Sequence, residues 1–114
     1  MAQTTSTDPL AALGRYSGPA TLILSSLAGG EKHGYALTKD IEQFAGVRLA
    51  PGTMYEALAR LEGQGLIEPV PTDSRRRPYR LAAGGAQALR AHLDDQRRVA
   101  DIGLRRLAEG GGFA

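Results

Sequence analysis

A helix that leads directly into an arginine-rich hairpin is the feature that most constrains how this chain can fold. Pro51 suits the first position of a helix, and Met54, Leu58 and Leu61 follow at the spacing of one helical face. Gly65 provides a stop at the end of this pattern. Because a short helix with a narrow apolar stripe gains most of its stability from packing, we expect it to lie against other helices.

Two short strands follow this helix and are expected to form a hairpin. Residues 66–71 and 78–82 read as the strands, and Pro69 removes a backbone donor from the first, which restricts it to an edge position. An isolated hairpin is marginal in water, so we expect this one to lean on the helices. The side chains available for that contact are Leu66, Val70, Tyr79 and Leu81.

The excess of positive charge is concentrated at the hairpin. The formal net charge of the whole chain is only +2, but residues 72–82 hold several arginines against Asp73 alone. Localised charge of this kind suits contact with phosphate groups. A solvated polar turn is the alternative interpretation. The arginines are Arg75, Arg76, Arg77 and Arg80.

Two further helices are expected ahead of Pro51. The first runs from about residue 17 to the glycine pair at 29–30, and the second from about residue 33 to Gly46. Each carries apolar side chains at helical spacing, which predicts a core of three packed helices. Residues 1–15 are expected to form a disordered or partly helical arm. The predicted core side chains are Ala20, Ile23, Leu24 and Leu27 in the first helix and Leu37, Ile41 and Phe44 in the second.

A long helix is predicted for residues 84–109, followed by a flexible tail at 110–114. Its apolar and small side chains alternate spacings of four and three residues, which is the repeat of a coiled-coil seam. We expect this helix to pair with a second copy of the chain as a dimerisation helix, with folding back onto the chain's own core as the alternative. The predicted dimer-interface residues are Leu89, Leu93, Gln96, Ala100, Gly103 and Leu107.

Composition and motifs argue against catalysis and against metal or cofactor binding. The chain contains no cysteine, and its two histidines, His33 and His92, lie on different predicted elements. Residues 29–32 lack the spacing of a phosphate-binding loop, and no serine lies in a nucleophile-elbow pattern. We therefore predict no catalytic residue, no metal site, no cofactor and no enzyme activity. No segment has the length of a membrane span or the pattern of a signal peptide, so the predicted location is the cytoplasm.

The outer face of the helix at residues 51–63 has a different character. Its side chains are mostly small or able to form hydrogen bonds, which would let the backbone approach the major groove of DNA; an ordinary solvent-exposed face is the alternative. Tyr55 at the edge of this face, and Tyr35 in the preceding helix, either donate a hydroxyl to a DNA phosphate or serve as core rings with exposed hydroxyls. The outward residues are Thr53, Glu56, Ala59, Arg60 and Gly63.

Several short motifs together cover about residues 19–90 and resemble the PadR family of bacterial transcriptional regulators. The resemblance implies a mainly α fold with a small β-hairpin, in which residues 16–83 form a winged helix-turn-helix DNA-binding domain ahead of the C-terminal dimerisation helix. It also implies a homodimeric repressor that binds double-stranded DNA at an inverted-repeat operator and releases it on a small-molecule or stress signal. The motifs are Leu22–Ala28, His33–Leu37, Pro51–Tyr55, Leu58–Leu61, Gly65–Ile67 and Tyr79–Leu81. The candidate DNA-contacting residues are Tyr35, Thr53, Tyr55, Arg60, Arg75, Arg76, Arg77 and Arg80, with Arg60 as the candidate for reading a guanine.

The chain departs from the family pattern in ways that leave other functions open. Its long helix begins without a side-chain cap, its hairpin contains three prolines, and it has no tryptophan to form an aromatic slot for a ligand. One alternative function is an adaptor that uses the winged helix for protein contact, although the polar face of the helix at 51–63 argues against it. The other is a ligand-binding sensor with weak DNA binding. The hairpin prolines are Pro69, Pro71 and Pro78.

Overall fold

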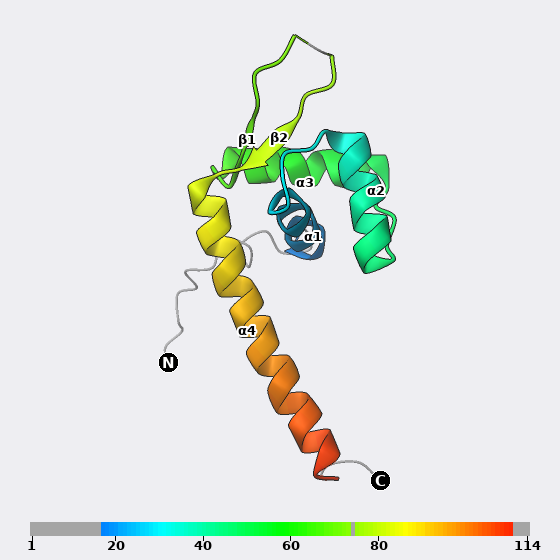
Figure 1. Ribbon diagram of the computed structural model, residues 1–114, viewed down its shortest axis with the longest axis vertical. Coiled ribbons are helices and arrows are strands. Elements are labelled where there is room, and N and C mark those ends of the chain that lie inside the picture. Colours follow the sequence, from blue (N-terminus) through cyan, green and yellow to red (C-terminus); the bar gives the residue numbers. More distant parts are fainter. Residues whose placement is uncertain (1–16, 74, 111–114) are drawn as a thin grey trace.

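The fold is mainly helical, with one two-stranded antiparallel hairpin and a long C-terminal helix, as the sequence predicted (Figure 1). The computed structural model describes residues 17–73 and 75–110, so the predicted N-terminal arm and most of the predicted tail lie outside the described residues. The elements, in chain order, are α1 (Ser17–Leu27), α2 (Gly34–Ala45), α3 (Pro51–Gly63), β1 (Ile67–Pro69), β2 (Tyr79–Leu81) and α4 (Ala83–Ala108).

The core lies where α1, α2 and α3 meet. All of the side chains predicted to be buried in α1 and α3 are buried, because each of these helices turns one apolar stripe toward the others. Leu37 and Ile41 of α2 join them, each with no exposed surface. Phe44 was predicted on the same face but is 51% exposed. It lies in the last turn of α2 and does not join the core cluster, although the next residue, Ala45, packs against that cluster.

One polar side chain is buried at the α1–α2 contact. Ser26 is 2% exposed, and its hydroxyl donates to the carboxylate of Asp40 over 2.6 Å. The Nζ of Lys32 donates to the carbonyl oxygen of Ser26 at 2.6 Å and lies 3.9 Å from the same carboxylate. These interactions satisfy the buried serine and tie the loop after α1 to the middle of α2.

The paired strands of the hairpin are shorter than predicted, and side chains from both sides of the hairpin pack against the helical core. Its paired register covers three residues on each strand, because Pro69 and the prolines beyond it have no backbone donor for a longer ladder. Leu66 and Ile67 are buried, and Tyr79 and Leu81 pack against the core from the second strand. Val70 is only half-buried and lies outside the core cluster.

Lys32 pairs with Tyr79 of β2 through an isolated antiparallel β-bridge. Its backbone N–H donates to the carbonyl of Tyr79 at 3.1 Å, and the N–H of Tyr79 donates back at 2.9 Å. The loop between α1 and α2 therefore holds the start of β2, at the end of the strand pair nearest the hairpin loop. Nothing local in the sequence signals this pairing.

The last helix, α4, begins on the core and then leaves it (Figure 1). Its N-cap residue, Ala82, makes no side-chain cap, as expected, but its N–H donates to the carbonyl of Leu66 at 3.0 Å. Ala88 and Leu89 are buried in the core, whereas Val99 and Leu107 beyond them are 68% and 59% exposed. The first turns of α4 thus fold back on the chain's own core and bury Leu89 of the predicted seam, whereas the exposed part of that seam begins at Leu93.

The hairpin loop and the far end of α4 lie at opposite ends of the molecule (Figure 1). The longest extent is 58 Å, and α4 accounts for much of it. Among the residues that the structure describes, no helix combines the length and apolarity that crossing a membrane requires.

Candidate nucleic-acid interface

Helix α3 turns one face inward and leaves the other open. Met54, Ala57, Leu58 and Leu61 are each at most 2% exposed and define the inward face. Pro51 begins the helix without a side-chain cap on Ala50 before it. The opposite face is exposed except at Thr53, which is half-buried, so most of this face is available to another molecule. Its exposed members are Gly52, Glu56, Ala59, Arg60 and Gly63.

The predicted contact residues of α3 do not share one face. Successive residues of an α-helix are rotated by about 100°, so Thr53 and Tyr55 lie roughly 160° apart around the axis. Thr53 and Arg60 occupy one flank of the open face, and Tyr55 occupies the other. If the helix enters a groove, these two flanks face opposite walls of it.

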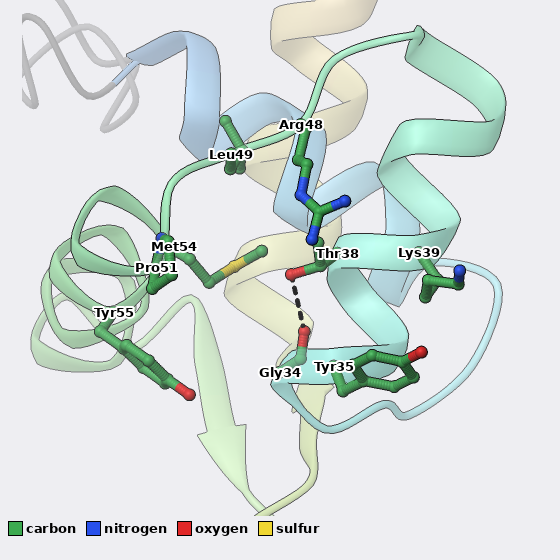
Figure 2. Close-up of a pocket in the computed structure, with 9 residues that line it drawn as sticks. All are labelled: Gly34, Tyr35, Thr38, Lys39, Arg48, Leu49, Pro51, Met54 and Tyr55. Atoms are coloured by element: carbon green, nitrogen blue, oxygen red, sulfur yellow. Dashed lines mark hydrogen bonds between the residues drawn. The ribbon is translucent and has the colours of Figure 1, made fainter.

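Tyr55 meets the start of α2. Its ring lies beside Gly34, where an added Cβ would be 3.7 Å from the tyrosine hydroxyl oxygen (Figure 2). His33 caps α2, because its Nδ1 accepts from the N–H of Ala36 over 3.4 Å. Tyr35 follows in the first turn, and both tyrosines are 65% exposed. Neither ring is a core residue, which removes one of the two interpretations open for them.

A cleft of about 280 Å³ separates α2 from the start of α3 (Figure 2). Tyr35 and Tyr55 line it, together with two basic residues, Lys39 and Arg48. The Nζ of Lys39 lies 5.9 Å from the centroid of the Tyr35 ring, within reach of a cation–π contact. Arg48 is 3.9 Å from the carboxylate of Glu42, an exposed pair that leaves most of the guanidinium in solvent.

Lys39 and Arg48 were not among the residues selected from the sequence. The sequence signals for them are weak: Lys39 is one turn after Tyr35, and Arg48 lies in the loop just before Pro51. Only the tertiary fold, in which α2 and α3 both pack against α1, brings them to one cleft. They extend the basic surface beyond the hairpin.

The hairpin arginines continue this surface on the other side of Tyr55. Arg75, Arg76 and Arg77 are exposed, and they line a second hollow of about 410 Å³ with both tyrosines. Arg80 is placed differently, because it lies on β2 and its Nε is 3.5 Å from the carboxylate of Glu68 on the facing strand. The sequence grouped Arg80 with the loop arginines, and the structure separates it from them.

The described residues offer little for other chemistry. They contain no group of three or more histidine, cysteine or acidic side chains that could hold a metal ion. What they do offer is a polar helix face beside exposed tyrosines and a cationic loop. A helix-turn-helix with a hairpin wing and such a surface is the architecture of a DNA-binding regulator.

Comparison with protein families gives the same answer. The model of the "Transcriptional regulator PadR-like family" matches residues 23–91, and the chain belongs to this family. It is a transcriptional regulator of the PadR type.

Three curated proteins illustrate the range of relatives. "Transcriptional regulator Rv3488" of Mycobacterium tuberculosis is 39% identical over 70% of this chain and 74% of its own length. An uncharacterized 37.1 kDa protein in transposon TN4556 of Streptomyces fradiae is 42% identical over 68% of this chain, which spans only 23% of that protein. "Transcriptional activator GvpE2" of Halobacterium salinarum is 34% identical over 72% of this chain and 40% of its own length.

Solved structures share the fold. A PadR family transcription regulator from Clostridium difficile R20291 superposes with a TM-score of 0.69 at 28% identity, covering 77% of this chain and 96% of that one. A PadR family transcriptional regulator from Eggerthella lenta superposes with a TM-score of 0.66 at 30% identity, covering 86% and 88%. The winged helix and the long final helix are thus the family's architecture.

Proposed function

We propose that this PadR-family regulator is a repressor that binds an inverted-repeat operator as a homodimer and leaves it on a small-molecule or stress signal. The observation that carries the proposal is one continuous surface, formed by the start of α2, the open face of α3 and the hairpin loop. Tyr35 and Tyr55 border both hollows, and basic side chains complete each lining: Lys39 and Arg48 in the first hollow and the loop arginines in the second. That combination suits a groove flanked by phosphates.

In the proposed complex, α3 enters the major groove and its two flanks face the two DNA strands. On one side, the hydroxyls of Tyr35 and Tyr55 donate to phosphate oxygens, with the charges of Lys39 and Arg48 beside them. These contacts hold the helix in register. They carry no sequence information of their own.

The hairpin loop supplies the remaining phosphate contacts through Arg75, Arg76 and Arg77. Their effect is mainly electrostatic, so binding should weaken steeply as salt is added. Arg80 contributes less, because Glu68 already faces its guanidinium.

Sequence is read from the open face of α3. Arg60 is long enough to reach a guanine from the flank it shares with Thr53, and an arginine–guanine pair is the commonest specific contact in the major groove. Replacing Arg60 by alanine should cost about 1–3 kcal/mol at one operator position. An equal loss on every sequence would instead make Arg60 a phosphate contact.

Dimerisation through α4 would set the distance between two recognition helices. Two helices in successive major grooves must lie about 34 Å apart, and an inverted repeat mirrors the two-fold axis of the dimer. The exposed apolar side chains along α4 support this arrangement, because a monomer would leave them in water. They are Leu93, Val99, Leu104 and Leu107.

The proposal is tested by gel shift with the DNA upstream of the protein's own gene, read at 50 mM and 200 mM salt with an unrelated duplex of equal length as control. We expect a salt-sensitive complex whose affinity exceeds that of the complex with control DNA, since specific binding is typically at least a thousandfold tighter than non-specific binding. Equal affinity for the two duplexes would contradict sequence-specific binding to this DNA. A reporter gene behind the same DNA then distinguishes repression from activation, which matters because one relative is named as an activator.

A further inference from the structure

Among the side chains of α3 that are longer than alanine, Glu56 points most directly away from the core. Met54, two residues earlier, is 2% exposed and lies near the centre of the inward face, between Leu58 and Leu61. A rotation of about 100° per residue puts Glu56 roughly 200° from Met54 around the helix axis. Its direction is therefore closer to the direct opposite of the inward face than the directions of Thr53 and Arg60 are. Glu56 itself is exposed.

The residues one or two turns from Glu56 on the same face of α3 have small side chains or none. Gly52 lies one turn before it, and Ala59 and Gly63 lie one and two turns after it. An added Cβ on Gly52 or Gly63 would meet nothing within 4 Å, so no described part of this chain approaches the helix at these glycines. If α3 enters a groove, the backbone can come close enough for the Glu56 carboxylate to reach the base edges.

A carboxylate at this position cannot serve as a phosphate contact. It accepts hydrogen bonds and donates none, and it is repelled by the charged backbones on both sides of the groove. No ion pair within the described part of the chain occupies it. Its only favourable partner on the groove floor is therefore a hydrogen-bond donor.

In the major groove, cytosine presents its N4 amino group and no acceptor of its own. Guanine presents two acceptors and thymine one acceptor and a methyl group, so both repel or exclude a carboxylate. Adenine offers a donor but places the N7 acceptor beside it. The donor pattern thus favours cytosine opposite Glu56.

From this geometry we infer that Glu56 is a specificity-determining residue, whose carboxylate accepts a hydrogen bond from a cytosine N4 amino group in each half-site. The inference rests on the proposed DNA-binding function and adds to it a second base-reading side chain with the opposite sign of charge from Arg60. Glu56 lowers affinity for every sequence in which it meets no donor. It therefore sharpens specificity by penalising wrong sites as well as by rewarding the right one.

The test is selection of preferred sites from duplexes with a randomised central segment, using the full-length protein and its E56Q and E56A variants. For the unchanged protein we expect a preference for one cytosine per half-site of roughly 5- to 150-fold over the other bases. E56A should lose this preference and bind random duplex more tightly. E56Q should shift it toward adenine, because glutamine can pair with adenine N6 and N7.

The matched control is E62Q, which removes the same charge from an exposed position of α3 at the edge of the inward face. It should select the same motif as the unchanged protein. If all variants bind and E56Q and E56A also select the unchanged motif, Glu56 reads no base and the inference is overturned. If the unchanged protein selects no motif at all, the proposed sequence-specific DNA binding itself fails.

Discussion

Gly85, in the first turn of α4, packs so tightly on the carbonyl group of Leu66 that there is no room for a side-chain carbon between them. The same carbonyl accepts the N–H of Ala82 at 3.0 Å. Leu66 lies in the turn that links α3 to the hairpin. The direction of the final helix is therefore fixed directly against the end of the helix proposed to read DNA.

Replacing Gly85 by alanine should destabilise the protein by about 1–3 kcal/mol, because the new methyl group must displace backbone. The neighbouring G84A is the matched control, since a Cβ at Gly84 would make only an ordinary contact of 3.8 Å with the carbonyl oxygen of Gly65. Alanine favours the helix over glycine by about 0.5–1 kcal/mol, so G84A should be neutral or stabilising. Urea unfolding at one fixed protein concentration measures both. Equal stabilities would show that α4 can shift on Leu66 at little cost.

The buried hydrogen bond of Ser26 gives a second stability prediction. Replacing Ser26 by alanine removes the donor to Asp40, and hydrogen bonds to charged groups are the stronger kind. Because Asp40 is partly exposed and can recruit water, we expect a loss of about 1–2 kcal/mol. S25A, one residue away on α1, should change stability by less than about 0.5 kcal/mol. Thermal unfolding followed by circular dichroism would detect the difference, and matching midpoints for the two variants would remove the role assigned to Ser26.

The hairpin arginines should set the salt dependence of DNA binding. Each arginine that neutralises a phosphate contributes about 0.9 to the slope of log affinity against log salt. The double variant R75A/R77A should therefore reduce that slope by up to about 2 per chain while leaving the preferred sequence unchanged. R98A/R105A removes the same charge from the face of α4 opposite the predicted seam and should leave the slope as it was. Titrations of one operator duplex at several salt concentrations provide the measurement, and an unaltered slope for R75A/R77A would place the loop outside the interface.

Most of the fold was predictable because it follows from local periodicity. The spacing of Ile23, Leu24, Leu58 and Leu61 identifies inward helix faces whatever they pack against. The same rule failed at Phe44, since periodicity gives the direction of a side chain but not how much of it a neighbouring element covers.

The parts of the site that were missed depend on contacts between residues distant in the sequence. The backbone pairing of Lys32 with Tyr79 leaves no local pattern, and neither does the cleft that brings Lys39 to Arg48. Charge clustering did identify the hairpin arginines. It could not show that Glu68 faces Arg80, because that pairing depends on the strand register.

The exposed seam of α4 makes the dimer testable by one substitution. Ala100 lies on the predicted seam, and A100E would place a charge where two copies of the helix are proposed to meet. Desolvating an unpaired carboxylate is costly, so we expect A100E to be monomeric at concentrations where the unchanged protein is a dimer, as measured by light scattering after size-exclusion chromatography.

A91E introduces the same residue on the opposite, exposed face of α4 and should remain dimeric. On DNA, monomeric A100E should bind an isolated half-site about as well as the unchanged protein does but lose the extra affinity that an inverted repeat gives a dimer. Two measurements thus separate the possibilities. A dimeric A100E would move the interface away from Ala100, whereas a monomer that still binds the full repeat as tightly as the unchanged protein would show that α4 does not couple the two recognition helices.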